Sequence, residues 1–132
     1  MSTGTGAVLL SRWLGVAWLL TACAGGGGSV HLPPAAITAG TVTPLQLELT
    51  AWGAGWGRLS RRYRALDCHY YTARDTTQHV VPMRPVSEDH RRFVSQCTLP
   101  PLARADSAVI YWFTFTFDGQ PNRRPVETVA IR

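Results

Sequence analysis

The sequence predicts an all-β protein that forms a single antiparallel β-sandwich of about six to seven strands. Apolar and polar residues alternate in several short segments, which is the period of half-buried strands. Turn residues recur at roughly the 8 to 12-residue spacing that is typical of sandwiches. No window of about eleven or more residues sustains the apolar spacing of a helix.

Six segments carry the strand pattern. In the first of them Leu45, Leu47 and Leu49 share one face, and three glycines in residues 53–57 then indicate a turn. A short segment that Pro82 interrupts suits an edge strand, because proline cannot donate a ladder hydrogen bond. The strands are predicted at residues 43–52, 63–72, 79–83, 91–99, 108–117 and 126–131.

The strongest strand signal lies in residues 108–117, where aromatic and β-branched residues alternate. We expect its aromatic face to be the core, which places Trp112 on the opposite face. Asp118 and Gly119 begin the turn that leads to the last strand. The predicted core face consists of Val109, Tyr111, Phe113, Phe115 and Phe117.

The first 22 residues have the layout of a cleaved secretory signal peptide. Arg12 is the one charged residue before an apolar segment at residues 13–22, which ends in small residues. This segment is too short to span a bilayer, since a spanning helix needs about 20 apolar residues.

The residues Leu20-Thr21-Ala22-Cys23 resemble the lipobox of bacterial lipoproteins. The resemblance implies that Cys23 receives a diacylglyceryl group, that signal peptidase II cleaves before it, and that the new amine is often acylated, for example with palmitate. Ala24 in place of aspartate implies the outer membrane, with the protein facing the periplasm or the cell surface. An ordinary secretory signal, with Cys23 incidental, and a single uncleaved anchor are the alternatives.

Residues 23–40 are predicted to be the lipidated cysteine and a flexible linker. The glycines at residues 25–28 favour flexibility, and Pro33 and Pro34 stiffen the part that follows. Residues 41–132 then remain for one sandwich domain, which would stand away from the membrane.

Two further cysteines follow the lipobox, Cys68 and Cys97. In an oxidising periplasm or at a cell surface, two remaining cysteines most simply pair. We therefore expect a disulfide between Cys68 and Cys97.

Three hydrophobic patterns mark the second half of the chain: Leu66 with Tyr70, Leu99-Pro100, and Tyr111-Trp112-Phe113 leading to Asp118-Gly119. Together they resemble the bacterial immunoglobulin-like or fibronectin-III-like superfamily over roughly residues 40–132. The resemblance implies an immunoglobulin-like sandwich. The cysteine and tryptophan arrangement of antibody domains does not match, because no tryptophan follows Cys68 at the usual interval.

All 13 basic residues are arginine, and the formal net charge is +5. Arg58, Arg61, Arg62 and Arg64 lie close together in the sequence. Such a patch could contact lipid phosphate or anionic polysaccharide. The alternative is that it forms the solvated face of one strand and its loop.

The sequence carries no recognisable catalytic pattern. It has no G-x-S-x-G, phosphate-loop or dinucleotide motif. The candidate metal ligands fit no zinc spacing; they are His69, His79 and His90 with Asp67, Asp89 and Cys68. We therefore expect no enzyme activity, no cofactor, no metal and no nucleic-acid partner.

Binding is the favoured class of function. Trp52 and Trp56 flank the glycine turn, and Tyr63 and Tyr71 are expected on outer strand faces. Tryptophan, tyrosine and arginine are enriched in interfaces, which favours a protein-interaction or envelope-assembly component. A glycan- or peptidoglycan-binding module is the alternative, and it requires Trp52 and Trp56 to be exposed and coplanar. Packing of both tryptophans over the open end of the sandwich would undercut either hypothesis. The candidate binding residues are Trp52, Trp56, Arg58, Arg61, Arg62 and Tyr63.

Overall fold

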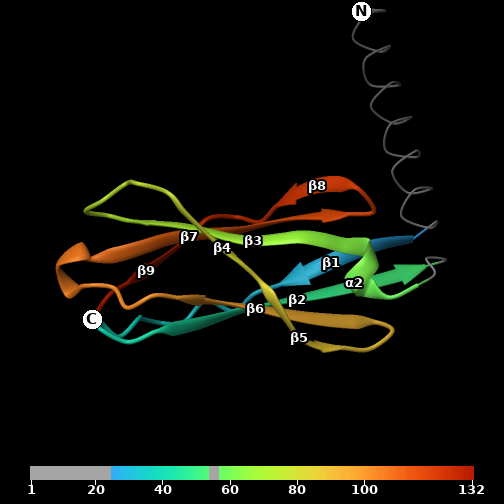
Figure 1. Ribbon diagram of the computed structural model, residues 1–132, viewed down its shortest axis with the longest axis horizontal. Helices are drawn as coiled ribbons and strands as arrows, with labels where there is room; N and C mark the ends of the chain where they lie inside the picture. Colours follow the sequence, from blue (N-terminus) through green and yellow to red (C-terminus); the bar gives the residue numbers. More distant parts are fainter. Residues whose placement is uncertain (1–24, 54–56) are drawn as a thin grey trace, which may run out of the picture.

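The computed structural model describes residues 25–53 and 57–132, which form two antiparallel β-sheets packed face to face (Figure 1). One sheet has the strand order β1-β2-β6-β5; the other has the order β4-β3-β7-β8, with β9 also paired to β7. The predicted antiparallel β-sandwich is confirmed, with nine strands in the described residues instead of six to seven. The strands are β1 (Gly25–Val30), β2 (Thr43–Gly53), β3 (Tyr63–Thr72), β4 (His79–Pro82), β5 (Arg84–Glu88), β6 (Arg92–Leu99), β7 (Ala108–Phe117), β8 (Gln120–Arg123) and β9 (Glu127–Ala130).

All six predicted strands are present. The bounds of β3 and β7 are those expected; β2, β4 and β6 differ by one residue at one end, and β9 is shorter by one residue at each end. The sequence analysis missed β1, β5, β8, the short helix α2 (Leu59–Arg62) and the 3-10 helix η1 (Arg104–Asp106). Every residue of β5 and β8 is exposed, so neither strand shows the alternation that marks a half-buried strand.

The core lies between the two sheets, where the leucines of β2 face the aromatic side of β7. The predicted core face of β7 is confirmed, since Val109, Tyr111 and Phe113 are buried almost completely and Phe115 nearly so. Leu45, Leu47 and Leu49 are also buried, as their alternation predicted. Both observations follow from the two-residue period of a strand with one face on the core.

A β-bulge interrupts β3. The register of β3 against β7 shifts between Arg64 and Asp67, and Ala65 between them has a φ of 54°. One extra residue reverses the face to which the following side chains point. In an uninterrupted strand Tyr63 would point to the same face as Asp67, which is the outer face. Because the bulge lies between them, Tyr63 faces the core instead.

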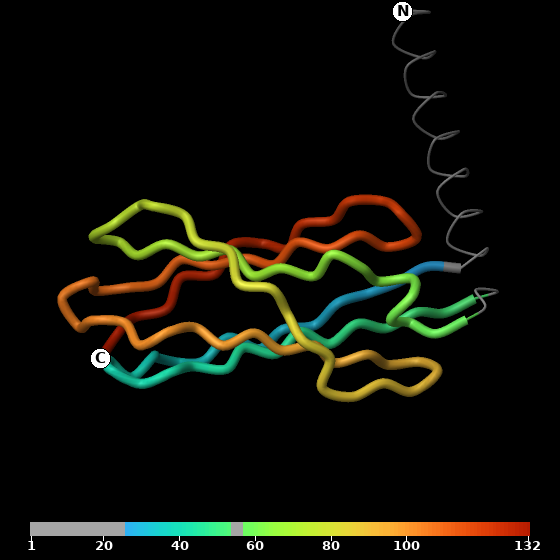
Figure 2. The backbone as a smooth tube through the Cα atoms, in the orientation of Figure 1, coloured from blue at the N-terminus to red at the C-terminus, as the bar shows by residue number. Residues whose placement is uncertain are grey.

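The predicted flexible linker is wrong for residues 25–40. β1 pairs with β2 along its whole length, from Gly25 opposite Gly53 to Val30 opposite Glu48. Ile37 is buried and forms a parallel bridge with Ile131 beside the other sheet. The sandwich thus includes residue 25, not only residues from 41 onward, and the start of β1 lies at the end opposite the C-terminus (Figure 2).

The glycines of β1 allow aromatic rings to approach its backbone on both faces. A Cβ on Gly27 would lie 2.2 Å from the Tyr63 hydroxyl and 3.0 Å from the Phe117 ring. On the opposite face, a Cβ on Gly26 would lie 3.0 Å from the Trp52 ring. Glycine at these positions is therefore required for close packing of a strand, rather than for flexibility.

His31 fixes the segment that follows β1. Its Nδ1 donates to the Gln46 carbonyl oxygen at 2.6 Å, and its Nε2 accepts the hydroxyl hydrogen of Tyr111 at 2.5 Å. Since a carbonyl only accepts, Nδ1 carries a hydrogen, and in the neutral imidazole Nε2 is then the acceptor for the Tyr111 hydroxyl. Burial lowers the pKa of His31, which favours this neutral form.

Candidate functional site

The predicted binding residues near the glycine turn lie at the end of the sandwich where β1 begins, which we call the β1 end. Trp52 is 54% exposed, and Arg58 and Arg61 are exposed. Trp56 and Cys23 lie outside the described residues. The coplanar arrangement of Trp52 and Trp56 that a glycan site requires stays a prediction.

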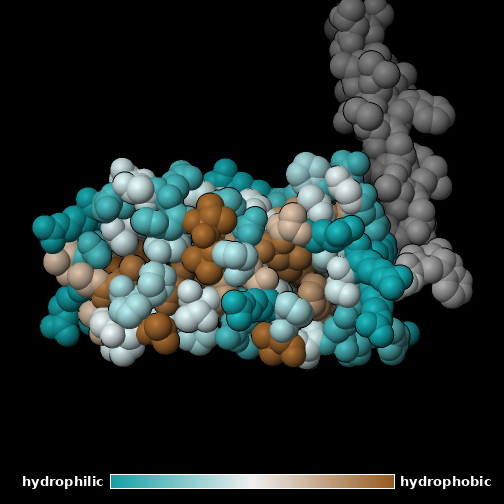
Figure 3. All heavy atoms as spheres, in the orientation of Figure 1, coloured by the Kyte–Doolittle hydropathy of each residue, from teal (hydrophilic) through white to brown (hydrophobic). Residues whose placement is uncertain are grey.

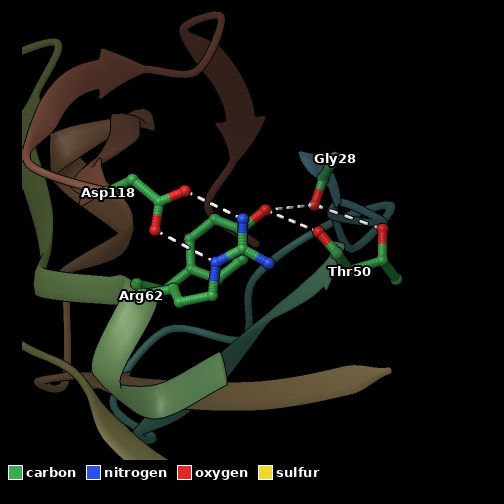
Figure 4. A network of polar contacts seen from close by, with 5 residues as sticks. Gly28, Thr50, Arg62 and Asp118 are labelled. Carbon is green, nitrogen blue, oxygen red and sulfur yellow. Dashed lines mark hydrogen bonds and ion pairs between the residues drawn. The ribbon is translucent and has the colours of Figure 1, made fainter. Parts of the chain in front are cut away.

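Tyr63 is not a surface residue, which corrects the prediction that it belongs to an exposed aromatic set. It is 2% exposed because the bulge in β3 turns it inward, where it stacks on Phe117. Its hydroxyl donates to the Thr50 carbonyl oxygen at 2.6 Å (Figure 4). Tyr63 thus fastens β3 to β2, and the possible glycan site loses one of its aromatic members.

Arg62 has a structural role at the same end. Its guanidinium makes two hydrogen bonds to the Asp118 carboxylate, of 3.0 and 2.8 Å (Figure 4). The same guanidinium lies over the Phe117 ring. The hydrogen bond from Arg62 lowers the pKa of Asp118. The pair joins α2 to the turn after β7, so Arg62 is less available to a ligand than Arg58 or Arg61.

The β5–β6 turn adds two residues to the β1 end that the sequence analysis did not include, His90 and Arg91. Both are exposed and line a groove together with Trp52, Leu59 and Arg62. Figure 3 shows that hydrophilic surface gathers at the ends of the sandwich, while hydrophobic patches lie nearer its middle. This turn lies beside Trp52 because β6 pairs with β2. No local sequence pattern therefore predicts that His90 and Arg91 belong to the β1 end.

A second aromatic surface lies on the outer face of the five-stranded sheet. Trp112 stacks on His69 at a ring distance of 5.3 Å and meets the edge of Tyr71 at 6.1 Å. Arg123 of β8 lies 4.9 Å from the centre of the Trp112 ring. We call these four residues the Trp112 cluster.

The outward position of the Trp112 cluster agrees with the sequence analysis, which placed Tyr71 and Trp112 on outer faces. Trp112 is nevertheless only 7% exposed, because its neighbours cover it. His69 Nε2 lies 2.7 Å from the Thr114 hydroxyl, which holds the imidazole against the indole. Val80, 55% exposed, pairs with His69 and extends this surface onto β4.

Cys68 on β3 and Cys97 on β6 approach each other across the core. Both are buried free thiols in the structure, so the expected disulfide stays a prediction. A hydrogen bond with the Cys97 thiol, together with burial, raises the pKa of Cys68. The fold therefore brings together the two cysteines that the sequence analysis paired, from different sheets.

The histidines considered for metal binding are dispersed. His69 stacks on Trp112 on the outer face of the five-stranded sheet, whereas His79 stacks on Tyr70, whose side chain is buried in the core. Within residues 25–53 and 57–132, no group of three or more His, Cys, Asp and Glu side chains is arranged to hold a metal ion.

The part of the chain that the structure describes contains no helix long and apolar enough to cross a membrane. A scan against known protein families matches no family model. A search of curated proteins finds no match to the chain.

Proposed function

We propose that this protein is a membrane-anchored, non-catalytic lipoprotein that acts as a protein-interaction or envelope-assembly component. The anchor is the acylated Cys23, and the location is the outer membrane, facing the periplasm or the cell surface. Support for the anchor comes from the resemblance of Leu20-Thr21-Ala22-Cys23 to a lipobox. The sandwich of residues 25–132 is then the water-facing binding domain.

The Trp112 cluster is the observation that supports partner binding most directly. A tyrosine and an exposed arginine lie against the covered Trp112 ring on one outer sheet face, and exposed Val80 continues this surface. These residue types dominate binding energy at protein interfaces, where they lie in desolvated central patches. Arg123 can contact a partner while its guanidinium remains over the indole.

Oxidation of Cys68 and Cys97 to a disulfide is part of this proposal. The two thiols would lose two protons and two electrons to a disulfide oxidant of the envelope. The resulting bond would join β3 to β6, and so link the two sheets. It would hold the sheet that carries the Trp112 cluster to the sheet that carries β1.

A photo-crosslinking amino acid at Val80 tests the partner surface in cells of the native organism. We expect Val80 to give a discrete adduct with an envelope protein, whereas Val42, which is 59% exposed before β2, gives none. Arg123→Glu should weaken the Val80 adduct about ten-fold, as expected for an interface arginine.

Arg84→Glu on exposed β5 is the matched control, because it reverses the same charge on the other sheet. Equal adducts at Val80 and Val42, or an Arg123→Glu variant that crosslinks as well as Arg84→Glu, would contradict the assignment of this face.

The glycan alternative keeps one supporting feature, the exposed ring of Trp52 beside the groove at the β1 end. The same groove is the basis of the inference that follows.

A further inference from the structure

The β1 end lies next to the position of the proposed anchor. Cys23 is two residues before Gly25 in the sequence, and two peptide units span at most about 7–8 Å. Gly25 pairs with Gly53 and Gly26 with Trp52. Because β1 is a paired strand instead of a flexible linker, acyl chains on Cys23 would hold this end of the sandwich close to the lipid surface.

Three cations at the β1 end are available to a ligand. Arg58, Arg61 and Arg91 are exposed and form no ion pair with any residue that the structure describes. Arg62 and Arg92, by contrast, are paired with Asp118 and Glu48.

The nearby carboxylates accept hydrogen bonds from backbone amides. Glu88 accepts the Ser60 amide at 2.9 Å, and Asp89 accepts the amides of Arg91 and Arg92 at 2.8 and 2.9 Å. These bonds fix the turn and α2 relative to each other, and they leave the free guanidinium groups to face solvent. The geometry favours an anionic ligand that approaches from the end of the sandwich.

Trp52 provides an apolar contact at the same place. Its ring packs against the glycine backbone of β1 on one side, while about half of its surface is exposed. Tryptophan is enriched at the level of lipid headgroups, where its amphipathic ring is most stable. Arginine binds phosphate through two parallel hydrogen bonds, and each basic residue near an anionic leaflet contributes about 1 kcal/mol.

We propose that the β1 end docks on the anionic headgroups of the bilayer that holds Cys23, with Arg58, Arg61 and Arg91 on lipid phosphates and Trp52 at the headgroup level. This inference rests on the proposed lipid anchor. The sandwich then stands with its long axis away from the membrane, and its C-terminal end is the distal one (Figure 1). The Trp112 cluster remains accessible from the side.

Hydrogen exchange of the membrane-purified protein tests the docking. The lipoprotein is placed in vesicles of phosphatidylethanolamine and phosphatidylglycerol, or in neutral phosphatidylcholine vesicles, and its intact mass is recorded first. The anchor is the same in both vesicles, so any difference reports contact of the protein surface with charge. We expect amides of residues 57–62 and 89–92 to exchange about ten-fold more slowly on the anionic vesicles.

The variant Arg58→Gln/Arg61→Gln/Arg91→Gln should lose this protection. Arg74→Gln/Arg104→Gln/Arg132→Gln is the matched control, since it removes three exposed arginines from the opposite end, and it should keep the protection. Loss of protection at 1 M salt would further support an electrostatic contact.

A lipidated mass without protection at the β1 end would overturn the docking while the anchor stands. An unlipidated mass would refute the anchor, and sedimentation with anionic vesicles would then test the docking alone. Sedimentation that depends on the three arginines would support the docking. No sedimentation would overturn the docking. Protection of the same amides by peptidoglycan fragments, but not by vesicles, would also overturn it in favour of a glycan site.

Discussion

A valine at position 27 is expected to displace β1 from the sandwich. The first side-chain atom at this position would lie 2.2 Å from the Tyr63 hydroxyl, which is itself fixed to the Thr50 carbonyl oxygen. Neither group can move without breaking the packing of Tyr63 on Phe117. We expect Gly27→Val to reduce the free energy of unfolding by about 3 kcal/mol in urea titrations, and to make residues 25–36 sensitive to protease.

Gly28→Val is the matched control, because Gly28 faces the outer side of the same strand. There a Cβ would lie 3.3 Å from the Thr50 hydroxyl and 3.4 Å from the Trp52 ring, which is half exposed and can move. We expect a loss of about 1 kcal/mol or less. If both variants lose the same stability, β1 is not packed as described.

His31→Ala is expected to be similarly destabilising, by about 3 kcal/mol. The substitution removes a ring that packs 4.8 Å from Phe113. It also leaves the buried Tyr111 hydroxyl and the partly buried Gln46 carbonyl without their partner. The Tyr111→Phe/His31→Ala double variant should recover part of the loss, since it no longer buries an unpaired hydroxyl.

His31 also predicts a pH dependence of stability. Its folded-state pKa lies below the ordinary value of 6.5, because burial disfavours the charged form. The hydrogen bond to the Gln46 carbonyl and the charge of Glu127 oppose this shift, and the charge of Arg124 adds to it. The unfolded chain therefore binds more protons below pH 6.5. The stability that neutral His31 contributes is complete above that pH and falls by at most about 1.4 kcal/mol per pH unit below it.

The His31→Gln variant isolates this effect, because glutamine can donate to Gln46 and accept from Tyr111 but does not titrate. The difference in unfolding free energy between the two proteins should shrink as the pH falls below 6.5. A difference that is constant from pH 8 to pH 5 would show that His31 does not titrate in the way that its burial requires.

The half-buried strands could be predicted from the sequence because their alternation records which face is covered. β7 is the clearest case, since the aromatic face from Val109 to Phe117 is the core face of the structure. β5 and β8 could not be predicted in this way, as both are exposed edge strands without alternation. Their pairing is decided by tertiary contacts, which leave no periodic pattern.

β1 is the most instructive failure. A run of glycines is typical of a flexible linker, and the sequence of residues 25–28 therefore predicts one. In the structure the same residues form a strand, because Trp52 on one face and Tyr63 with Phe117 on the other occupy the space that side chains would need. A glycine-rich strand is distinguished from a glycine-rich linker by the aromatic side chains that pack on it, and these residues are remote from β1 in the sequence.

The candidate site was predicted in part. Trp52, Arg58 and Arg61 are exposed, as a binding site requires, but Tyr63 is buried because one bulge residue reverses the alternation of β3. No sequence pattern marked the bulge, since alanine at position 65 is not a residue that signals a positive φ. His90 and Arg91 join the β1 end through β6 pairing alone.

The measurement that tests the central claim most directly is the intact mass of the protein from a membrane fraction, with and without globomycin, an inhibitor of signal peptidase II. The account predicts a mature chain that begins at Cys23 and carries lipid, a precursor that accumulates under the inhibitor, and a mass two hydrogen atoms below that of the reduced protein because Cys68 and Cys97 are joined. An unlipidated chain whose mass the inhibitor does not change would contradict the anchor, and a fully reduced mass would contradict the disulfide.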